Sequence, residues 1–233
     1  MKKIALALTF TLLLISCGGD TQNTMTVTGN VKGLKKGDLY LQKFNDTLLI
    51  TIDSLKVEGN GSFTFKTEVE SPEIYNLYLK KEDHNDFNDR ITFFGEPGNI
   101  TINTSWDTFD RNAKITGSES NIKYKEYRKI MSDFSIKNIG IIQNAQNSKV
   151  ALDSLQIDSV QKLSDKTIKR SYAYALNFAL TNTNSTVAPY VALYEVPDAN
   201  RIYLDSIYNS LTPEVSSSKY GNALKKYLDE LPK

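Results

Sequence analysis

The chain of 233 residues contains one cysteine, Cys17, and one histidine, His84. A single thiol excludes an internal disulfide and a CxxC redox pair. Any Ser-His-Asp arrangement would have to use His84, which lies in the polar stretch KKEDHNDFNDR, where a solvated loop histidine is the ordinary outcome. We therefore predict that the chain is not an enzyme, with no catalytic residue and no cofactor.

The same polar stretch contains Asp83, Asn85, Asp86 and Asp89, whose oxygen atoms are of the type that binds Ca²⁺. The EF-hand pattern needs a glycine at its sixth position, and Asn88 occupies that place. We predict no metal centre, and a weak surface cation site is left open.

The sequence has little excess charge of either sign, with 28 Lys and Arg against 27 Asp and Glu. A protein that binds nucleic acid neutralises phosphates with a basic surface, and no such bias exists here. We predict no nucleic-acid partner.

The chain also lacks a hydrophobic run long enough to span a bilayer. The run from Ile4 to Ile15 follows Lys2 and Lys3, and it is shorter than the roughly 20 residues that a spanning helix needs. This pattern is typical of a secretory signal. Loss of its two lysines would change the formal net charge from +1 to −1.

The signal ends in LISC, residues 14–17, which resembles the lipobox of bacterial lipoproteins. The resemblance implies cleavage before Cys17 and acylation of its sulfur, which gives a signal peptide at 1–16 and a polar tether at 17–24. Acyl chains would hold the mature protein at a membrane in the cell envelope. Gly18 differs from the aspartate of inner-membrane retention signals in enteric lipoproteins, which favours the outer membrane and leaves its face open.

Residues 25–117 show the alternating pattern of short strands. Examples are MTVTGNV, DLYLQKF and EIYNLYLK, and turn residues such as Gly59-Asn60-Gly61 and Glu96-Pro97-Gly98 separate the segments. We predict eight strands in an antiparallel sandwich or open barrel, with a hairpin at Gly59-Asn60-Gly61.

Residues 118–233 change to a helical pattern. SESNIKYKEYRKIMSDF opens with serines that can cap a helix, and a polar segment follows from 138 to 166. Three shorter helices are predicted toward the end, separated near Pro197 and Pro213. The fold class is therefore α+β, with an N-terminal β domain and a C-terminal all-α segment.

Several blocks carry a resemblance to a known family: TVTGNVKGLKKGDLYLQ, FFGEPGNITI and ITGSESNIKYKEY. They resemble domain of unknown function 4369 of Bacteroidota envelope lipoproteins, over residues 25 to about 125. In NSTVAPYVAL and LDSIYNSLTPEV the chain is similar to the helical segment that follows in that family, with its Asn-Ser motif and Leu-x-Pro-Glu turn.

In that family the helical segment precedes a thioredoxin-like domain of the TlpA and AhpC/TSA type. The present chain departs from this pattern, because it ends at about the place where that domain would begin, so no catalytic residue is carried over. Two functions fit the resemblance. The first is a non-catalytic binding module for a protein, peptide or glycan, and the second is an accessory to a thioredoxin-like protein supplied by another chain.

Aromatic residues offer the candidate binding surface. The chain has 13 tyrosines and 10 phenylalanines, and we name Tyr40, Tyr75, Tyr78 and Phe93 on the predicted strands as candidate binding residues. The alternative is that most aromatic residues line the sandwich core and its junction with the helices. An aromatic cleft at that junction is the place where we expect a ligand.

Five Asp-Ser/Thr-aliphatic triplets, which begin at Asp46, Asp53, Asp153, Asp158 and Asp205, are similar to the O-glycosylation motif of exported Bacteroidota proteins. Asp and Ser are also common in turns and helix caps, so both interpretations stay open.

Overall fold

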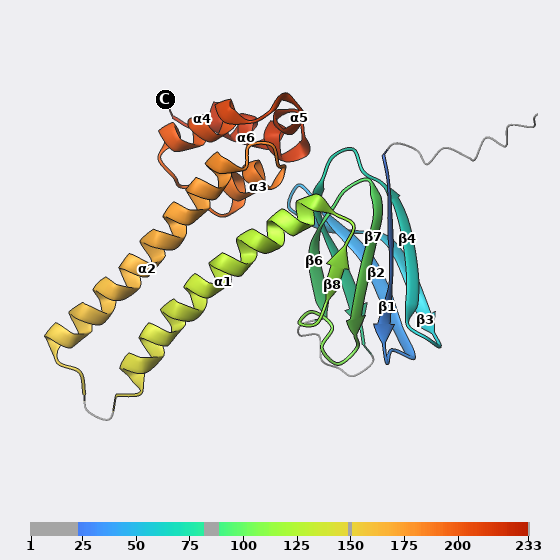
Figure 1. The fold of residues 1–233 in the computed structure, drawn as a ribbon, viewed down its shortest axis with the longest axis horizontal. Coiled ribbons are helices and arrows are strands. Elements are labelled where there is room, and N and C mark those ends of the chain that lie inside the picture. The colour runs from blue at the N-terminus through green and yellow to red at the C-terminus, as the bar shows by residue number, and fades with distance from the viewer. Residues whose placement is uncertain (1–22, 82–88, 149–150, 233) are drawn as a thin grey trace, which may run out of the picture.

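The structure, a computed structural model, describes residues 23–81, 89–148 and 151–232. In these residues eight strands come first and six helices follow, which confirms the predicted eight strands and the predicted order of strands before helices (Figure 1). The strands are β1 (Thr24–Lys32), β2 (Lys36–Asn45), β3 (Leu48–Glu58), β4 (Ser62–Glu68), β5 (Glu73–Lys80), β6 (Arg90–Gly95), β7 (Gly98–Ser105) and β8 (Lys114–Thr116). The helices are α1 (Glu119–Gln146), α2 (Ser154–Thr181), α3 (Val187–Tyr194), α4 (Arg201–Ser210), α5 (Pro213–Ser216) and α6 (Lys219–Glu230).

The strands form two four-stranded sheets that pack as a sandwich. One sheet has the order β4-β1-β7-β8, and the other has the order β3-β2-β5-β6. Alternate residues of both sheets point inward, so that Val27, Phe65 and Ile100 of the first sheet share a core with Leu41 and Leu77 of the second. The two-sheet fold class is confirmed, with one difference from a purely antiparallel arrangement, because β1 and β7 pair in parallel.

The predicted hairpin at Gly59-Asn60-Gly61 is wrong, although the turn itself is there. The strand before the turn, β3, pairs with β2, and the strand after it, β4, pairs with β1 in the other sheet. Gly61 has φ +75°, and a Cβ at this position would overlap the carbonyl oxygen of Val31. The glycine therefore allows a tight crossing between the sheets rather than a return within one sheet.

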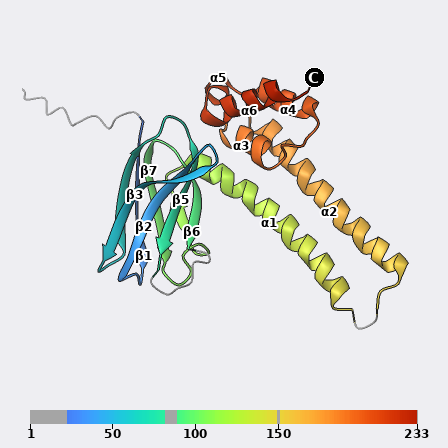
Figure 2. The same ribbon diagram turned by 180° about the vertical axis from the view of Figure 1, so that it is seen from behind.

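The helical part consists of a long two-helix arm and a group of short helices. Helix α1 leads away from the sandwich and α2 returns antiparallel to it (Figure 1). Helices α3 to α6 lie at the end of α2 that is nearer the sandwich (Figures 1 and 2). The polar segment predicted at 138–166 is largely helical, since it forms the end of α1 and the start of α2. Its seam is polar too, because the Ser164 hydroxyl donates to the Asn138 amide oxygen at 2.7 Å.

A second core joins the helices to the sandwich. Ile74 of β5 and Phe94 of β6 point away from the sandwich interior and pack among helical residues that include Tyr124, Val191 and Leu224. β5 places its inward face in the sandwich core and Ile74 in this second core, so the strand is buried along most of its length. No described helix is both long enough and apolar enough to cross a membrane.

Candidate functional site

The four aromatic residues predicted to bind a ligand lie in two different environments. Tyr75 and Phe93 have no exposed surface, and their rings stack in the sandwich core with centroids 5.9 Å apart. They are core residues, so their prediction as a binding surface is wrong. The inward face of β5 and β6 buries them, a choice of face that alternation alone did not determine.

Tyr40 and Tyr78 lie on the outer face of the same sheet and are half-buried. They are directly opposite each other on β2 and β5, with ring centroids 5.9 Å apart. The guanidinium of Arg90 lies 5.5 Å from the centroid of the Tyr78 ring. This ladder of cross-strand pairs stabilises the outer face of the sheet.

The aromatic residues at the junction form packed interior rather than an open cleft. Phe94 lies at the centre, with its ring centroid 5.5 Å from that of Tyr124, 5.5 Å from that of Tyr190 and 5.8 Å from that of Tyr220. The backbone N–H of Ile74 donates to the Tyr220 hydroxyl at 3.0 Å. The aromatic cluster therefore joins the sandwich to the helices.

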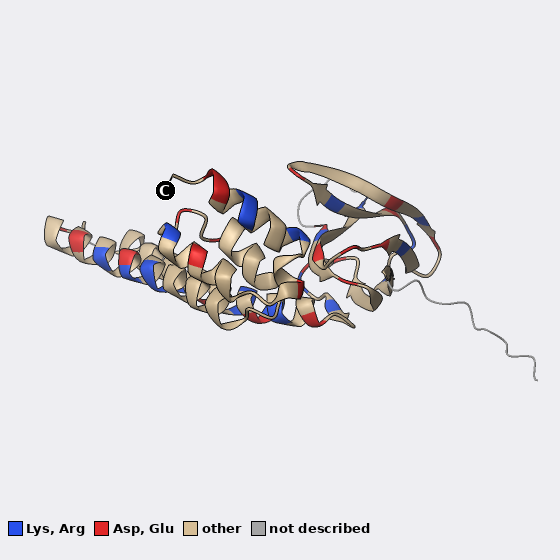
Figure 3. Ribbon diagram, turned by 90° about the horizontal axis from the view of Figure 1, so that it is seen from above, with Lys and Arg blue, Asp and Glu red and all other residues tan. Residues whose placement is uncertain are grey.

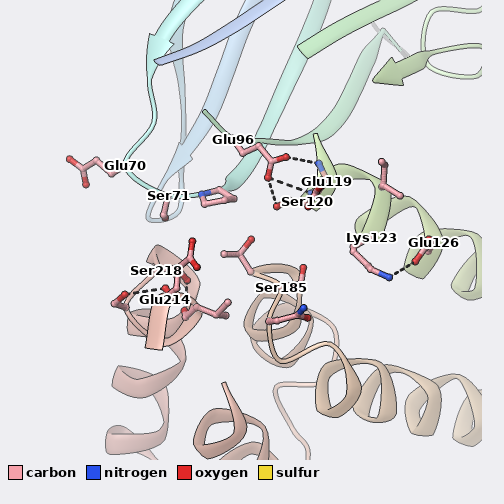
Figure 4. Close-up of a pocket in the computed structure, with 16 residues that line it drawn as sticks. Glu70, Ser71, Glu96, Glu119, Ser120, Lys123, Glu126, Ser185, Glu214 and Ser218 are labelled. Atoms are coloured by element: carbon pink, nitrogen blue, oxygen red, sulfur yellow. Dashed lines mark hydrogen bonds and ion pairs between the residues drawn. The ribbon is translucent and has the colours of Figure 1, made fainter. Parts of the chain in front are cut away.

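A cleft of about 730 Å³ opens at this junction, and its walls combine polar side chains with the apolar surface of Pro72, Ile122 and Val215 (Figure 4). This volume lies within the range of ligand pockets, roughly 300–1,000 Å³. Five segments that are separate in the sequence supply the walls: the β4–β5 loop at 70–72, Glu96 after β6, the first turns of α1, the α2–α3 loop at 184–186, and α5 with the residues after it. A cleft at the junction is thus present, and the expected aromatic lining is replaced by carboxylates, hydroxyls and an amide.

Glu96 fixes the wall formed by α1. Its carboxylate accepts from the backbone N–H of Glu119 at 2.5 Å and from the hydroxyl of Ser120 at 2.5 Å (Figure 4). Ser118 caps the same helix by accepting from the N–H of Asn121 at 2.9 Å. A carboxylate at a helix N-terminus is favourable because it meets unpaired N–H groups and the positive end of the helix dipole.

The β6 backbone holds the start of α1 from the other side. The N–H of Phe94 donates to the side-chain oxygen of Asn121 at 3.1 Å, and the Ser118 hydroxyl donates to the carbonyl of Phe94 at 3.0 Å. Because these groups are buried, the position of α1 relative to the sheet is well defined.

The wall of the cleft is acidic. It contains five glutamates and one lysine, Lys123, which already pairs with Glu126 at 3.1 Å. Across the described residues, the side chains of Glu70, Glu119 and Glu214 form no ion pair with Lys or Arg. The carboxylates do not converge on one point, since the described chain has no group of three or more His, Cys, Asp or Glu placed to hold a metal ion.

Thr186 contributes a second kind of polar group to the wall. The residue is only 8% exposed, and within the described chain its hydroxyl has no hydrogen-bond partner. A buried hydroxyl without a hydrogen-bond partner destabilises a protein, so a ligand that supplies a partner for Thr186 would bind more favourably.

The cleft residues were missed because aromatic content directed the interpretation to the strands. A usable signal existed in the motifs that carry the family resemblance. GEPG supplies Glu96, GSES supplies Glu119 and Ser120, the Asn-Ser motif supplies Asn184 and Ser185, and the Leu-x-Pro-Glu turn supplies Glu214. Motifs spread over more than a hundred positions thus meet in one cleft.

Comparison with known proteins agrees with the part of this resemblance that lies in residues 25 to about 125. Residues 25–124 match the model of a family described as a domain of unknown function (DUF4369). The matched range includes all eight strands, except for the first residue of β1, and the first turn of α1, and it is similar to that family as its motifs predict. No curated protein and no solved structure matched the chain.

Cys17 and His84, together with Asp83, Asn85 and Asp86, lie outside the described residues. Asp89 is described, and its buried carboxylate pairs with Lys81 at 2.6 Å. Of the Asp-Ser/Thr triplets, Asp153 caps α2 by accepting from the N–H of Gln156 at 2.8 Å. This triplet therefore has a structural role, as expected of caps.

Proposed function

We propose that the protein is a non-catalytic binding protein of the cell envelope, anchored to a membrane through an acylated Cys17, and that the junction cleft is its ligand site. One observation carries the proposal: the family motifs GEPG, GSES, Asn-Ser and Leu-x-Pro-Glu, which are far apart in the sequence, line the same cleft. Packing would explain motifs that end in a core, but each of these supplies at least one exposed or half-exposed polar side chain: Glu96, Glu119, Asn184 with Ser185, and Glu214.

The way in which the cleft is built also favours binding. Its α1 wall is tied to the sandwich by Glu96 and Ser118, and the opposite wall is tied by the contact of Lys219 with Ser71, whose hydroxyl accepts from the Lys219 N–H at 3.0 Å. Walls held at fixed positions lose little conformational entropy when a ligand binds.

A photo-crosslinking amino acid placed at Glu214, in the native envelope, tests the site. We expect an adduct of defined mass from Glu214, and no such adduct from the control position Lys162, an exposed residue in the first third of α2, toward the end of the helix that lies away from the sandwich (Figure 1). Equal labelling from both positions would show that the cleft is not the ligand site.

The anchor has a separate test. Metabolic labelling with palmitate should mark the unvaried protein and should be lost in Cys17→Ser. An unmarked protein with a titratable thiol would remove the lipid anchor from the proposal.

The alternative function is that of an accessory to a thioredoxin-like protein supplied by another chain. The match of residues 25–124 to the family supports it, because the resemblance implies that this domain occurs next to thioredoxin-like domains. The Glu214 adduct distinguishes the two functions, since under the alternative it would contain a thioredoxin-like protein.

A further inference from the structure

We infer that the junction cleft binds an organic cation with more than one amino or guanidinium group, either a free polyamine or the side chains of a basic peptide. This inference rests on the proposed ligand site and specifies the chemistry of its ligand.

The wall of the cleft carries a local excess of negative charge. Glu70, Glu119 and Glu214 lie on a β4–β5 loop, on α1 and on α5, and in the described structure they have no cationic partner. Acidic positions lie on both sides of the junction between strands and helices (Figure 3). A chain with a formal charge of only +1 thus concentrates carboxylates around one concave surface. Such a surface attracts cations, because a cleft with low-dielectric walls focuses its field.

The carboxylates of the wall are spread around the cleft and do not gather at one point. A metal ion needs several oxygen ligands around one point, and the described residues have no cluster of that kind. Charges spread around a cleft of about 730 Å³ match a ligand whose own charges are spread over several atoms.

The wall also offers hydrogen-bond acceptors to a cationic ligand. Amino and guanidinium groups are donors only, and the wall offers acceptors in the hydroxyls of Ser185 and Ser217 and the side-chain oxygen of Asn184. The hydroxyl of Thr186, buried in the wall and unpaired in the described chain, is a further acceptor. An anionic ligand would meet the glutamates instead, and a purely apolar ligand would leave the carboxylates and hydroxyls of the wall without partners.

Titration calorimetry with the mature chain tests the inference, with spermidine and trilysine as the two probes. A triacetylated trilysine, which has the same backbone and no side-chain charge, is the matched ligand control. We expect spermidine or trilysine to bind, with affinity that weakens as salt increases, and the acetylated peptide to bind at least about tenfold more weakly. Binding of spermidine alone identifies a free polyamine as the ligand class, and preference for trilysine identifies a basic peptide.

A matched pair of variants locates the binding. Glu70→Gln/Glu119→Gln/Glu214→Gln removes three charges from the cleft, and affinity should fall about tenfold or more. Glu58→Gln/Asp110→Asn/Glu230→Gln removes the same charge from exposed positions elsewhere and should change affinity less than about twofold. All six positions are exposed, so both variants should retain the unfolding temperature of the parent chain within a few degrees.

Two outcomes would overturn the inference. One is that neither cation binds, or that the acetylated peptide binds as well as trilysine. The other is that both triple variants lose affinity equally, which would mean attraction by net charge alone. In either case the crosslink from Glu214 would still report whether the cleft holds a ligand of another class.

Discussion

The ammonium group of Lys219 binds the carboxylate of Glu73, although 146 positions separate the two residues. Glu73 is 4% exposed and lies at the start of β5, while Lys219 is the first residue of α6. The same carboxylate accepts from Lys43 at 2.9 Å and from the Tyr75 hydroxyl at 3.2 Å. One buried acidic group thus connects β2, β5 and α6, and it fixes α6 against the sandwich beside the cleft.

Replacement of Glu73 should therefore destabilise the whole chain. Glu73→Gln leaves two lysines without their charge partner, and because both are partly exposed we expect a loss of about 2 kcal/mol in the free energy of unfolding. Chemical denaturation measures this loss. Glu70→Gln, at an exposed position three residues earlier, is the control and should change stability by less than about 0.5 kcal/mol. Similar values for the two variants would show that the ion pairs of Glu73 add nothing to stability.

Two glycines in helices should respond to alanine in opposite directions. Gly140 lies in α1 and has no atom within 4 Å of the position of a Cβ, so Gly140→Ala should stabilise the chain by about 0.5–1 kcal/mol. Gly221 lies in α6, where a Cβ would come within 2.5 Å of the carbonyl oxygen of Ser216. Gly221→Ala should cost about 1–3 kcal/mol, because α6 must move away from α5. Thermal unfolding of both variants is the measurement, and stabilisation by Gly221→Ala would contradict the close packing.

Ser118 is expected to matter more than an ordinary helix cap. Ser118→Ala removes the cap of α1 and also the bond to the Phe94 carbonyl, which is buried. We expect a loss of about 1–2 kcal/mol by denaturant titration. Ser154→Ala, at an exposed position in the first turn of α2, should differ from the parent by less than about 0.5 kcal/mol. A loss of less than about 0.5 kcal/mol in the free energy of unfolding for Ser118→Ala would mean that α1 is held by its other contacts alone.

Buried tyrosines should make the protein sensitive to alkali. Burial raises the pKa of Tyr75, Tyr127, Tyr190 and Tyr220 well above the usual value of 10.0, and burial with the nearby Asp198 carboxylate raises the pKa of Tyr172 to about 12. The folded state keeps these phenols protonated while the unfolded chain ionises near pH 10. For the four buried tyrosines the contribution to stability is therefore complete below pH 10 and is lost as the pH rises above it, by up to about 1.4 kcal/mol per pH unit for each one.

Tyrosinate absorbance and circular dichroism should then change together in one cooperative transition above pH 10. Tyr127→Phe removes one of these phenols, so it should move the midpoint to higher pH. Gradual ionisation without loss of secondary structure would show that the tyrosines are accessible in the folded protein.

The residue pattern of each segment was enough to predict its secondary structure, but not enough to predict which strands and helices it packs against. Alternation placed the strands, and serine followed by an amphipathic run placed the start of α1. The sequence predicts a hairpin at Gly61, where the structure has a crossing, because turn residues are the same whether the chain returns to its own sheet or enters the other one. Tyr75 and Tyr78 belong to one strand, and only the packing of the two sheets decides that Tyr75 faces the sandwich core while Tyr78 lies half-buried on the outer face.

The candidate site could not be derived from composition. Its glutamates belong to separate segments, each of which resembles an ordinary turn or helix start by itself. Glu96 follows a strand, Glu119 begins a helix and Glu214 follows a proline. Tertiary packing brings them to one surface, and only the family motifs marked them beforehand.

The attachment of α1 has a mechanical consequence. Its first turn forms part of the cleft wall, and a helix of 28 residues is about 42 Å long. A tilt of about 5° at Glu119 would thus displace the far end of the arm by about 4 Å. Because buried hydrogen bonds hold this first turn to the sheet, the cleft wall and the arm form one lever, whose largest displacement would be at the tip.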